Sequence, residues 1–454
     1  MKLWLRDFDP TLYSFCVSDL WAAWLMLLGG CLVYALTLRL TRPEDRGMML
    51  RLVVLALVLR CGWAWAQHRA IPQILVSGFA VDTLVNHKYC SAQAHRWRDE
   101  GTPPELPHSL GELHTRAVRL KTTVLYYIFG DSPLVAEAVT ITAGASVVLA
   151  VYLLALQMGY GGKAGRAAAA LVACFPSLVW YSTQDLRDPV ETCAVTWSFV
   201  GLVGLLRGTR RAGSLALLLA MDALSVAYRP YLGLLLLGGQ VVAASMAFRL
   251  GHGGFPRALK VVLIALGLVV GADVSVRELV ALYDWQGASL DALVLAQSIR
   301  DQAMQQAGSA YFLKVQPHGL LDAMVKLPVL VLLLVLTPLP FLPGSAAMLA
   351  TYPEMWFLYL YVLPNLVRGL RAGLRTDRVR VAIILAGIAP MVAAYAVRIV
   401  AAGVAIRLRT QFLPLFFVFA GLGADLHAKR RLARPTLAKQ YLQPRMVGKS
   451  EDLA

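Results

Sequence analysis

Eleven long apolar runs constrain the fold of this chain more than any other feature of its sequence. A transmembrane helix needs about 20 mostly apolar residues, and runs of about that length lie at about 18–38, 50–66, 134–157, 166–183, 190–206, 213–228, 230–248, 258–275, 350–367, 381–400 and 408–425. Of the 454 residues, 58% are hydrophobic and 15% are charged, whereas about a quarter of a soluble protein is charged. The sequence therefore predicts an all-α, polytopic transmembrane protein with about 11 full spans.

One further apolar segment, 325–350, is broken by prolines at four positions. We interpret it as a broken or re-entrant hairpin, because non-helical backbone at membrane depth is tolerated where protein buries it. The alternative is a chain of 12 or 13 full spans. The prolines are Pro328, Pro338, Pro340 and Pro343.

Basic residues predict the orientation of these spans. The formal net charge is +16, and most of the Lys and Arg residues fall in connections between apolar runs, which is typical of the cytoplasmic side of a membrane protein and argues against nucleic-acid binding. The clusters are Arg39–Arg51, Lys163–Arg166, Arg207–Arg211, Arg249–Lys260, Arg368–Arg380 and Lys429–Lys439. With all six inside, the N-terminus lies outside, and so do the regions 67–133 and 276–325, which we predict to be amphipathic helices with loops.

Several charged residues then collect at the outer ends of different spans. Ionisable groups at membrane depth are costly unless they are paired or solvated, so they mark candidate sites. An arginine fork binds phosphate and a carboxylate accepts a proton from a hydroxyl, so the set suits a reaction on a lipid phosphate. The alternative is that the arginines reach lipid headgroups and that Asp82 only caps a surface helix. The residues are Arg60, Asp82, Asp185, Arg187, Asp188, Arg229, Arg398, Arg407 and Arg409.

Three stretches carry a resemblance to a known family. They are Asp82 with Tyr89 in the first long outer region, FPSLVWYSTQDLRDP at 175–189, and Arg407 and Arg409 before FLPLFFVFAG. With its hydropathy pattern, the chain resembles membrane glycosyltransferases of the GT-C class, family 39 and its bacterial relatives, which include protein O-mannosyltransferases and aminoarabinose transferases. The resemblance covers most of 50–425.

The resemblance implies an enzyme that transfers one sugar from a polyprenyl-phosphate donor, with inversion, to a lipid, glycan or protein on the extracytoplasmic face of a bacterial inner membrane. It implies that Asp82 is the general base, that Asp188 is a second acidic site residue and that Arg407 or Arg409 holds the donor phosphate. We add Arg229, Arg187 and Arg60 to the expected phosphate-binding set, and Tyr89 and Lys88 to the substrate-binding set.

No cofactor is expected, and a need for a divalent metal is left open, because His87, His95 and His108 have no metal-ligand spacing. We expect an extra span with a basic loop at 1–49, the catalytic domain at 50–427 and a basic cytoplasmic tail at 428–454, disordered after Ala433. The main alternative is a flippase, transporter or polymerase of lipid-linked glycans. Such a protein would carry charges at mid-membrane depth, where Asp222 is the clearest acidic candidate.

Overall fold

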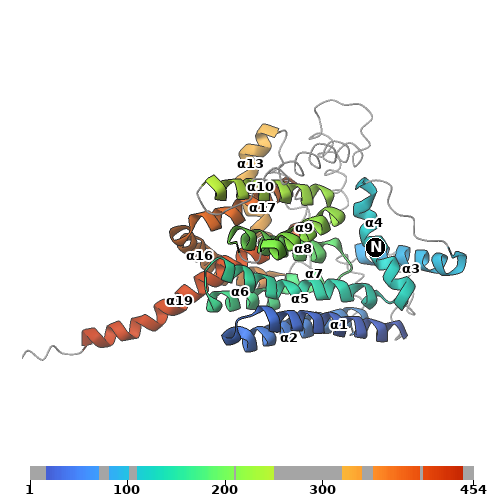
Figure 1. Cartoon of the computed structure of the whole chain (residues 1–454), viewed down its shortest axis with the longest axis horizontal. Coiled ribbons are helices and arrows are strands. Elements are labelled where there is room, and N and C mark those ends of the chain that lie inside the picture. Colours follow the sequence, from blue (N-terminus) through green and yellow to red (C-terminus); the bar gives the residue numbers. More distant parts are fainter. Residues whose placement is uncertain are drawn as a thin grey trace, which may run out of the picture.

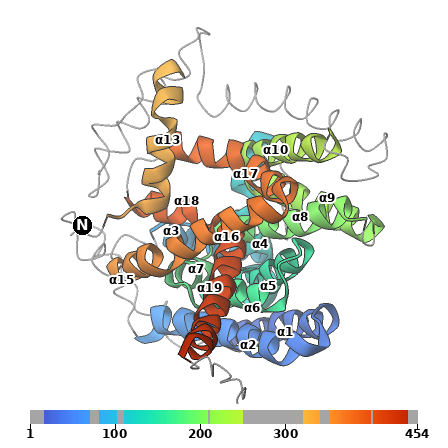
Figure 2. The same cartoon turned by 90° about the vertical axis from the view of Figure 1, so that its left-hand side faces the viewer.

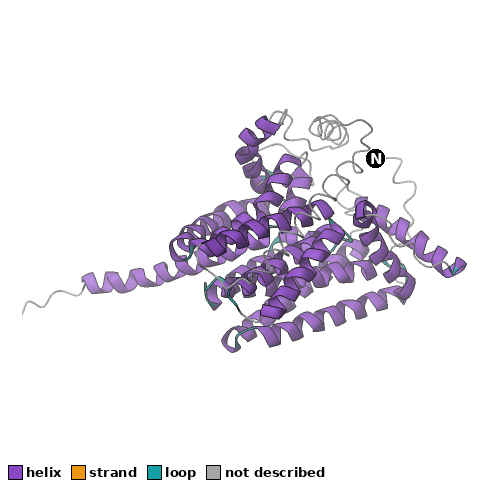
Figure 3. Ribbon diagram, turned by 45° about the horizontal axis from the view of Figure 1, so that its top comes forward, coloured by secondary structure: helices purple, strands orange, loops and turns teal. Residues whose placement is uncertain are grey.

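The structure is a computed structural model of the chain. It describes residues 17–70, 81–101, 110–208, 211–249, 320–339, 351–398 and 402–442. Every regular element among these residues is a helix, as Figure 3 shows. The all-α prediction is therefore confirmed for the part of the chain that the structure describes.

The helices follow one another along the chain with short connections. Those in the first half are α1 (Val17–Leu40), α2 (Pro43–Trp65), the π-helix η3 (Ala66–Ala70), α3 (Val81–Glu100), α4 (Leu110–Phe129), α5 (Pro133–Gln157), α6 (Gly162–Cys174), α7 (Pro176–Ser182) and α8 (Arg187–Leu206). Those in the second half are α9 (Arg211–Tyr228), α10 (Pro230–Arg249), α13 (Leu320–Leu336), α15 (Tyr352–Phe357), the π-helix η6 (Leu358–Val362), α16 (Leu363–Thr376), α17 (Arg378–Arg398), α18 (Ala402–Arg409) and α19 (Leu413–Leu442).

Proline fixes where several of these helices begin. Pro43, Pro133 and Pro176 stand in the first turns of α2, α5 and α7, where the missing N–H costs nothing and the fixed φ angle suits a helix. Because α2 starts at Pro43, most of the basic connection expected before residue 50 is already helical. The ends of these helices are thus determined by helix-start signals as well as by hydropathy.

Seven described helices are long and apolar enough to cross a membrane, and two bent pairs raise the number to nine. The pairs are α6 with α7, bent by 57°, and the part of the chain from Gly403 to Arg409 with α19, bent by 68°. The prediction of about 11 spans is not confirmed. Of the expected spans, 258–275 lies outside the described residues. The expected span 350–367 falls on α15, η6 and α16, which follow one another without a gap but are not among the helices that are both long and apolar enough to cross.

The first of the two regions predicted to face outward is helical where the structure describes it. In 67–133 the chain forms α3 and α4, and most of 276–325 lies outside the described residues. α13 contains Pro328 and ends at Leu336, so the proline-rich segment does begin as a helix. α19 continues to Leu442. The prediction of disorder after Ala433 is therefore wrong for the residues up to Leu442.

The helices pack as a layered bundle. α5 contacts α1, α6 and α8, α8 packs on α9, and α10 packs on α17. Figure 1 and the end-on view in Figure 2 both place α1 and α2 along one side and α10 with α17 along the other. Aliphatic and aromatic side chains form a large cluster between them, and buried polar side chains such as Ser198 and Gln240 lie among the same helices. Leu20, Trp24 and Leu28 of α1 are exposed, as expected for a lipid-facing helix.

Charged side chains from the basic connections gather at one end of the bundle. We call it the basic end and define it by Asp45, Arg166, Arg207 and Arg380. Arg166 forms an ion pair with Asp45 at the start of α2. Arg207 donates to the carbonyls of Leu156 and Gln157 at the end of α5, and Arg380 donates to that of Met158 at 3.2 Å. Residues from four of the predicted cytoplasmic connections therefore share one end, and α3 and α4 lie at the other, on the right of Figure 1.

Glycines let α16 and α19 touch through their backbones. A Cβ at Gly369 of α16 would collide with the carbonyl of Phe419 in α19, and a Cβ at Gly423 of α19 would collide with the carbonyl of Asn365 in α16. Small residues are the usual means of close helix packing in membranes. This crossing fixes the position of α19, and with it the break that precedes the helix.

Candidate functional site

The candidate site is built around Asp188, at the start of α8. Residues Thr183–Leu186 form the short connection from α7, and α8 begins at Arg187, so Asp188 falls in the first turn. A carboxylate is favoured there by the partial positive charge at the helix N-terminus. The Asp188 side chain is completely buried, which means that its charge must be balanced by neighbouring groups.

Three donors from three other parts of the chain satisfy the Asp188 carboxylate. Arg229 Nη2 lies 2.5 Å from Oδ1, and Arg407 Nε lies 2.5 Å from Oδ2. Gln411 Nε2 donates to Oδ1 at 2.6 Å. Both carboxylate oxygens are therefore occupied, and Asp188 acts as the point at which α8, the α9–α10 turn and the α18–α19 break meet.

The position of Arg229 follows from an unusually tight turn. α9 ends at Tyr228 and α10 begins at Pro230, so Arg229 is the single residue between them. Burial lowers the pKa of Arg229, but the Asp188 carboxylate outweighs burial and raises it above its usual range. Its Nη1 also approaches the hydroxyl of Tyr395 at 3.5 Å, and that hydroxyl donates to Gln411 Oε1.

The charges at this site do not balance. Arg187 stands beside Asp188 in α8 and interacts electrostatically with Asp188, Arg229 and Arg407. We call this group the Arg–Asp centre (Arg187, Asp188, Arg229 and Arg407). Within it, three arginines surround one carboxylate, so positive charges outnumber negative ones among these four described side chains. The Arg407 side chain is 24% exposed, so an anion can reach the centre from that side.

Arg409 does not belong to this centre, although only one residue separates it from Arg407. Its side chain is fully buried and forms an ion pair with Glu354 at 2.9 Å. It also donates to the carbonyls of Val335 and Thr337 at 3.0 Å. Burial raises the pKa of Glu354 despite the opposing effect of Arg409. Arg409 therefore ties α18 to α13 and α15, and its guanidinium is occupied by these internal partners.

Arg60 also has internal partners. Its guanidinium donates to the carbonyls of Ala56, Val172 and Ala173 at 3.1, 3.2 and 3.3 Å. The last two carbonyls close α6, where the break before α7 leaves them without helical partners, and a cation at a helix C-terminus is favourable. Arg60 thus stabilises a broken span from the neighbouring helix.

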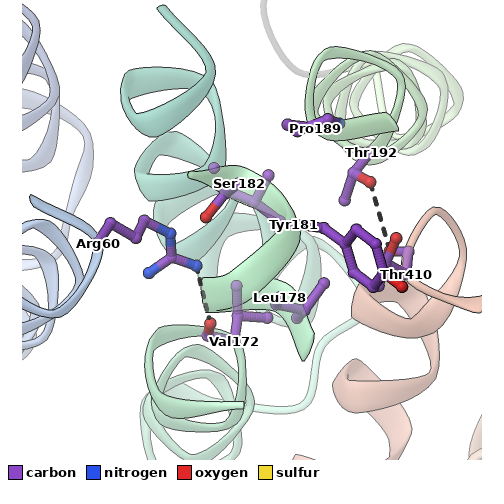
Figure 4. Close-up of a pocket in the computed structure, with 10 residues that line it drawn as sticks. Arg60, Val172, Leu178, Tyr181, Ser182, Pro189, Thr192 and Thr410 are labelled. Carbon is purple, nitrogen blue, oxygen red and sulfur yellow. Dashed lines mark hydrogen bonds between the residues drawn. The ribbon is translucent and has the colours of Figure 1, made fainter. Parts of the chain in front are cut away.

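A small cavity of about 20 Å³ separates Arg60 from the Arg–Asp centre. Figure 4 shows Arg60 on one side, Thr192 and Thr410 on the other, and Ser182 between them. The three hydroxyls already donate to backbone carbonyls. The space suits about one water molecule rather than a phosphate group.

The connection before α8 is held against α4. Lys121 forms an ion pair with Asp185, and Thr122 donates to the same carboxylate at 2.7 Å. Burial lowers the pKa of Lys121, but Asp185 outweighs it and raises the pKa above its usual value. Asp185 is therefore a structural link between the outer helices and the start of α8.

The expected base and substrate residues lie on α3. Asp82 is the second residue of that helix, and its side chain lies outside the described part of the structure. Lys88 and Tyr89 are exposed, and the Arg119 guanidinium stacks on the Tyr89 ring at 4.2 Å. Arg398 ends α17, again without a described side chain. Of the predicted set, the structure therefore brings together Asp188, Arg187, Arg229 and Arg407.

Sequence reasoning missed the neutral partners and one carboxylate. Gln411 and Tyr395 complete the network around Asp188, and Glu354 neutralises Arg409. Glu354 was the only carboxylate in the apolar stretch 350–367, which was a usable signal. Nothing in their spacing distinguished Gln411 and Tyr395 from other polar residues near span ends.

Among the described residues, no group of three or more His, Cys, Asp and Glu side chains is placed to hold a metal ion. Comparison with known proteins finds no matching family model, no similar curated protein and no similar solved structure.

Proposed function

We propose that this protein transfers a sugar from a polyprenyl-phosphate donor to an acceptor on the extracytoplasmic face of a membrane. The observation that carries this proposal is the surplus positive charge of the Arg–Asp centre, at the end of the bundle opposite the basic end. Arginine forks recognise phosphate by paired hydrogen bonds. A phosphate monoester leaving group gains negative charge during transfer, so a group in which guanidinium groups outnumber carboxylates favours the transition state as well as binding.

In this proposal Asp188 positions the arginines and is not the base. Both of its oxygens accept hydrogen bonds from Arg229, Arg407 and Gln411, so neither is free to receive a proton. The base remains Asp82, whose helix α3 packs against α4. α4 is in turn joined to the connection before α8 through Lys121 and Asp185.

The test is to incubate the purified protein with candidate polyprenyl-phosphate sugars and an acceptor fraction and to measure release of polyprenyl phosphate. Arg407→Ala should abolish release. Arg96→Ala is the matched control, because Arg96 is an exposed arginine of α3. Absence of release for every donor, or equal release by both variants, would refute the proposal.

The second candidate is a flippase or transporter of lipid-linked glycans. It is favoured by one observation, the buried acidic residue Asp222 inside a candidate span, because ionisable groups at that depth mark transport pathways. Reconstituted vesicles that move a labelled lipid-linked glycan across the bilayer without sugar transfer would favour this function over the first.

A further inference from the structure

We propose that Asp222 binds a proton inside the helix bundle and exchanges it, through Glu191, with solvent at the end of the bundle that carries the Arg–Asp centre. Asp222 lies in α9, six residues before its end at Tyr228, which places it about 9 Å along the helix from that end. Asp222 is 2% exposed and Glu191 of α8 is completely buried.

The hydrogen bonds of Asp222 match those of a protonated carboxyl group. Gln240 Nε2 donates to Asp222 Oδ1 at 3.1 Å and to Ser198 Oγ at 3.0 Å. Asp222 Oδ2 and Gln240 Oε1 are both buried and have no hydrogen-bond partner among the described residues. A proton on Oδ2 can be donated to Gln240 Oε1, which pairs an acid with an amide through two hydrogen bonds. One proton therefore accounts for two buried acceptors that would otherwise be unsatisfied.

No described cation pairs with Asp222. α9 packs against α8, α10 and α4. α8 carries Arg187, Asp188 and Glu191 toward the outer end, α4 presents Lys121, which is already paired with Asp185, and α10 contributes the neutral Gln240. An ionised carboxylate at this depth would be unpaired and poorly solvated, and protonation removes that cost.

Glu191 lies between Asp222 and the Arg–Asp centre. It is three residues after Asp188 on α8, so the two side chains are neighbours on one helix face. Its Oε1 accepts a hydrogen bond of 2.5 Å from Ser225, which stands three residues after Asp222 on α9. Its Oε2 has no described partner, and it interacts electrostatically with Arg229, Asp188 and Asp222. Glu191 and Ser225 therefore place oxygen atoms between Asp222 and the Arg–Asp centre.

A role of this proton in sugar transfer rests on the proposed function, whereas the binding of the proton to Asp222 does not. When an acceptor hydroxyl attacks the sugar, the O–C bond forms, the bond to the donor phosphate breaks, and the hydroxyl proton must leave the site. The base Asp82 receives that proton first, and an ionised Glu191 carboxylate can then take it up, which leaves Asp82 ionised again. The Glu191–Asp222 pair would then buffer the reaction close to where the proton is released.

Infrared difference spectroscopy of the full chain in detergent tests proton binding directly, since a protonated carboxyl has a C=O band that shifts in deuterium oxide. Between pH 6 and pH 8, Asp222→Asn should remove one such band, whereas Asp99→Asn, at an exposed carboxylate of α3, should not. Identical wild-type and Asp222→Asn spectra would overturn the proposal. Asn keeps the shape and both hydrogen bonds of a neutral acid, so the variant should unfold at nearly the wild-type temperature.

The rate of hydrogen–deuterium exchange of the same band tests the route. Glu191→Gln should slow the exchange at least tenfold while the Asp222 band remains. Thr196→Val is the control and should leave the rate unchanged, because Thr196 is a buried side chain of α8 whose hydroxyl donates to the carbonyl of Thr192. Equal rates in wild type and Glu191→Gln would remove Glu191 from the route. Because no donor or acceptor is needed, these results stand apart from any failure to detect sugar transfer.

Discussion

Arg409 and Glu354 form an ion pair from which water is excluded, with 2.9 Å between Arg409 Nη2 and Glu354 Oε1. Glu354 Oε2 accepts a second hydrogen bond, from the backbone N–H of Ser177, at 2.7 Å. The pair therefore joins α18, α15 and the start of α7, three segments that each border a break in a helix. The role of this pair is structural, although Arg409 is only two residues away from Arg407 of the candidate site in the sequence.

Removing one member of this pair should destabilise the protein strongly. Glu354→Gln leaves a buried guanidinium without its counter-charge, which typically costs about 3–5 kcal/mol. Thermal unfolding in detergent should show a clearly lower midpoint, and Lys429→Ala should show almost no change, because the Lys429–Asp425 pair has a Lys side chain that is 61% exposed. Equal effects of the two substitutions would contradict the structural role assigned to Arg409.

Arg407 should behave differently from Arg409. Arg407→Lys keeps the charge but loses the planar fork, and we expect donor affinity to fall about tenfold, equivalent to about 1.4 kcal/mol. Arg407→Ala should reduce affinity further, with little change in unfolding temperature. Binding of a labelled polyprenyl phosphate measures the effect. Unaltered binding by Arg407→Ala would show that this arginine serves only to neutralise Asp188.

Asp82→Asn should leave donor binding nearly intact and lower the rate of transfer by about 10²–10⁴, the usual contribution of general-base assistance. Asp82→Glu should be partly active at best, because the added methylene displaces the base. Turnover with saturating donor is the measurement, and Asp99→Asn on the same helix is the control. Normal transfer by a folded Asp82→Asn protein would return Asp82 to the role of a helix cap.

Stability should fall as the pH is lowered from about 6.5 to about 4, because of His87. Burial lowers the pKa of His87 from 6.5 to about 4, and the neutral ring contacts the hydroxyl of Tyr126 at 2.8 Å. The unfolded chain binds a proton below pH 6.5 and the folded chain does not, so the free energy of unfolding should decrease by about 3 kcal/mol at pH 4. Unfolding of His87→Gln should lose this pH dependence; an unchanged dependence would assign it to other groups.

The orientation can be tested at the two ends of the bundle. Asp99 in α3 and Arg211 at the start of α9 are both exposed and lie at opposite ends. In a cysteine-free background, an impermeant reagent should label Asp99→Cys in right-side-out vesicles and Arg211→Cys only in inverted vesicles. The reverse pattern would invert the proposed membrane topology.

The helical class and most of the apolar helices could be predicted from the sequence, because hydropathy marks them. The gathering of Asp188, Arg229 and Arg407 could also be predicted, because the charged residues indicate which end of each helix lies on which side. The sequence did not distinguish the role of Arg407 at the Arg–Asp centre from the structural roles of Arg409 and Arg60. Those roles depend on where helices break, since a break exposes carbonyl groups that compete with phosphate for a guanidinium. The carbonyls that bind Arg60 lie at the 57° bend between α6 and α7, and those that bind Arg409 lie at the end of α13; neither position has a signal in a hydropathy profile.

The backbone contact between α16 and α19 limits how the bundle can open. Side chains that line a boundary between helices can rotate aside, but Gly369 and Gly423 leave nothing to rotate, and each faces a carbonyl of the opposite helix. Parting these helices would require both backbones to move apart along the whole crossing. Any lateral entrance for a long isoprenoid tail must therefore form elsewhere on the circumference of the protein, and a chemical cross-link between α16 and α19 should leave that entrance in operation.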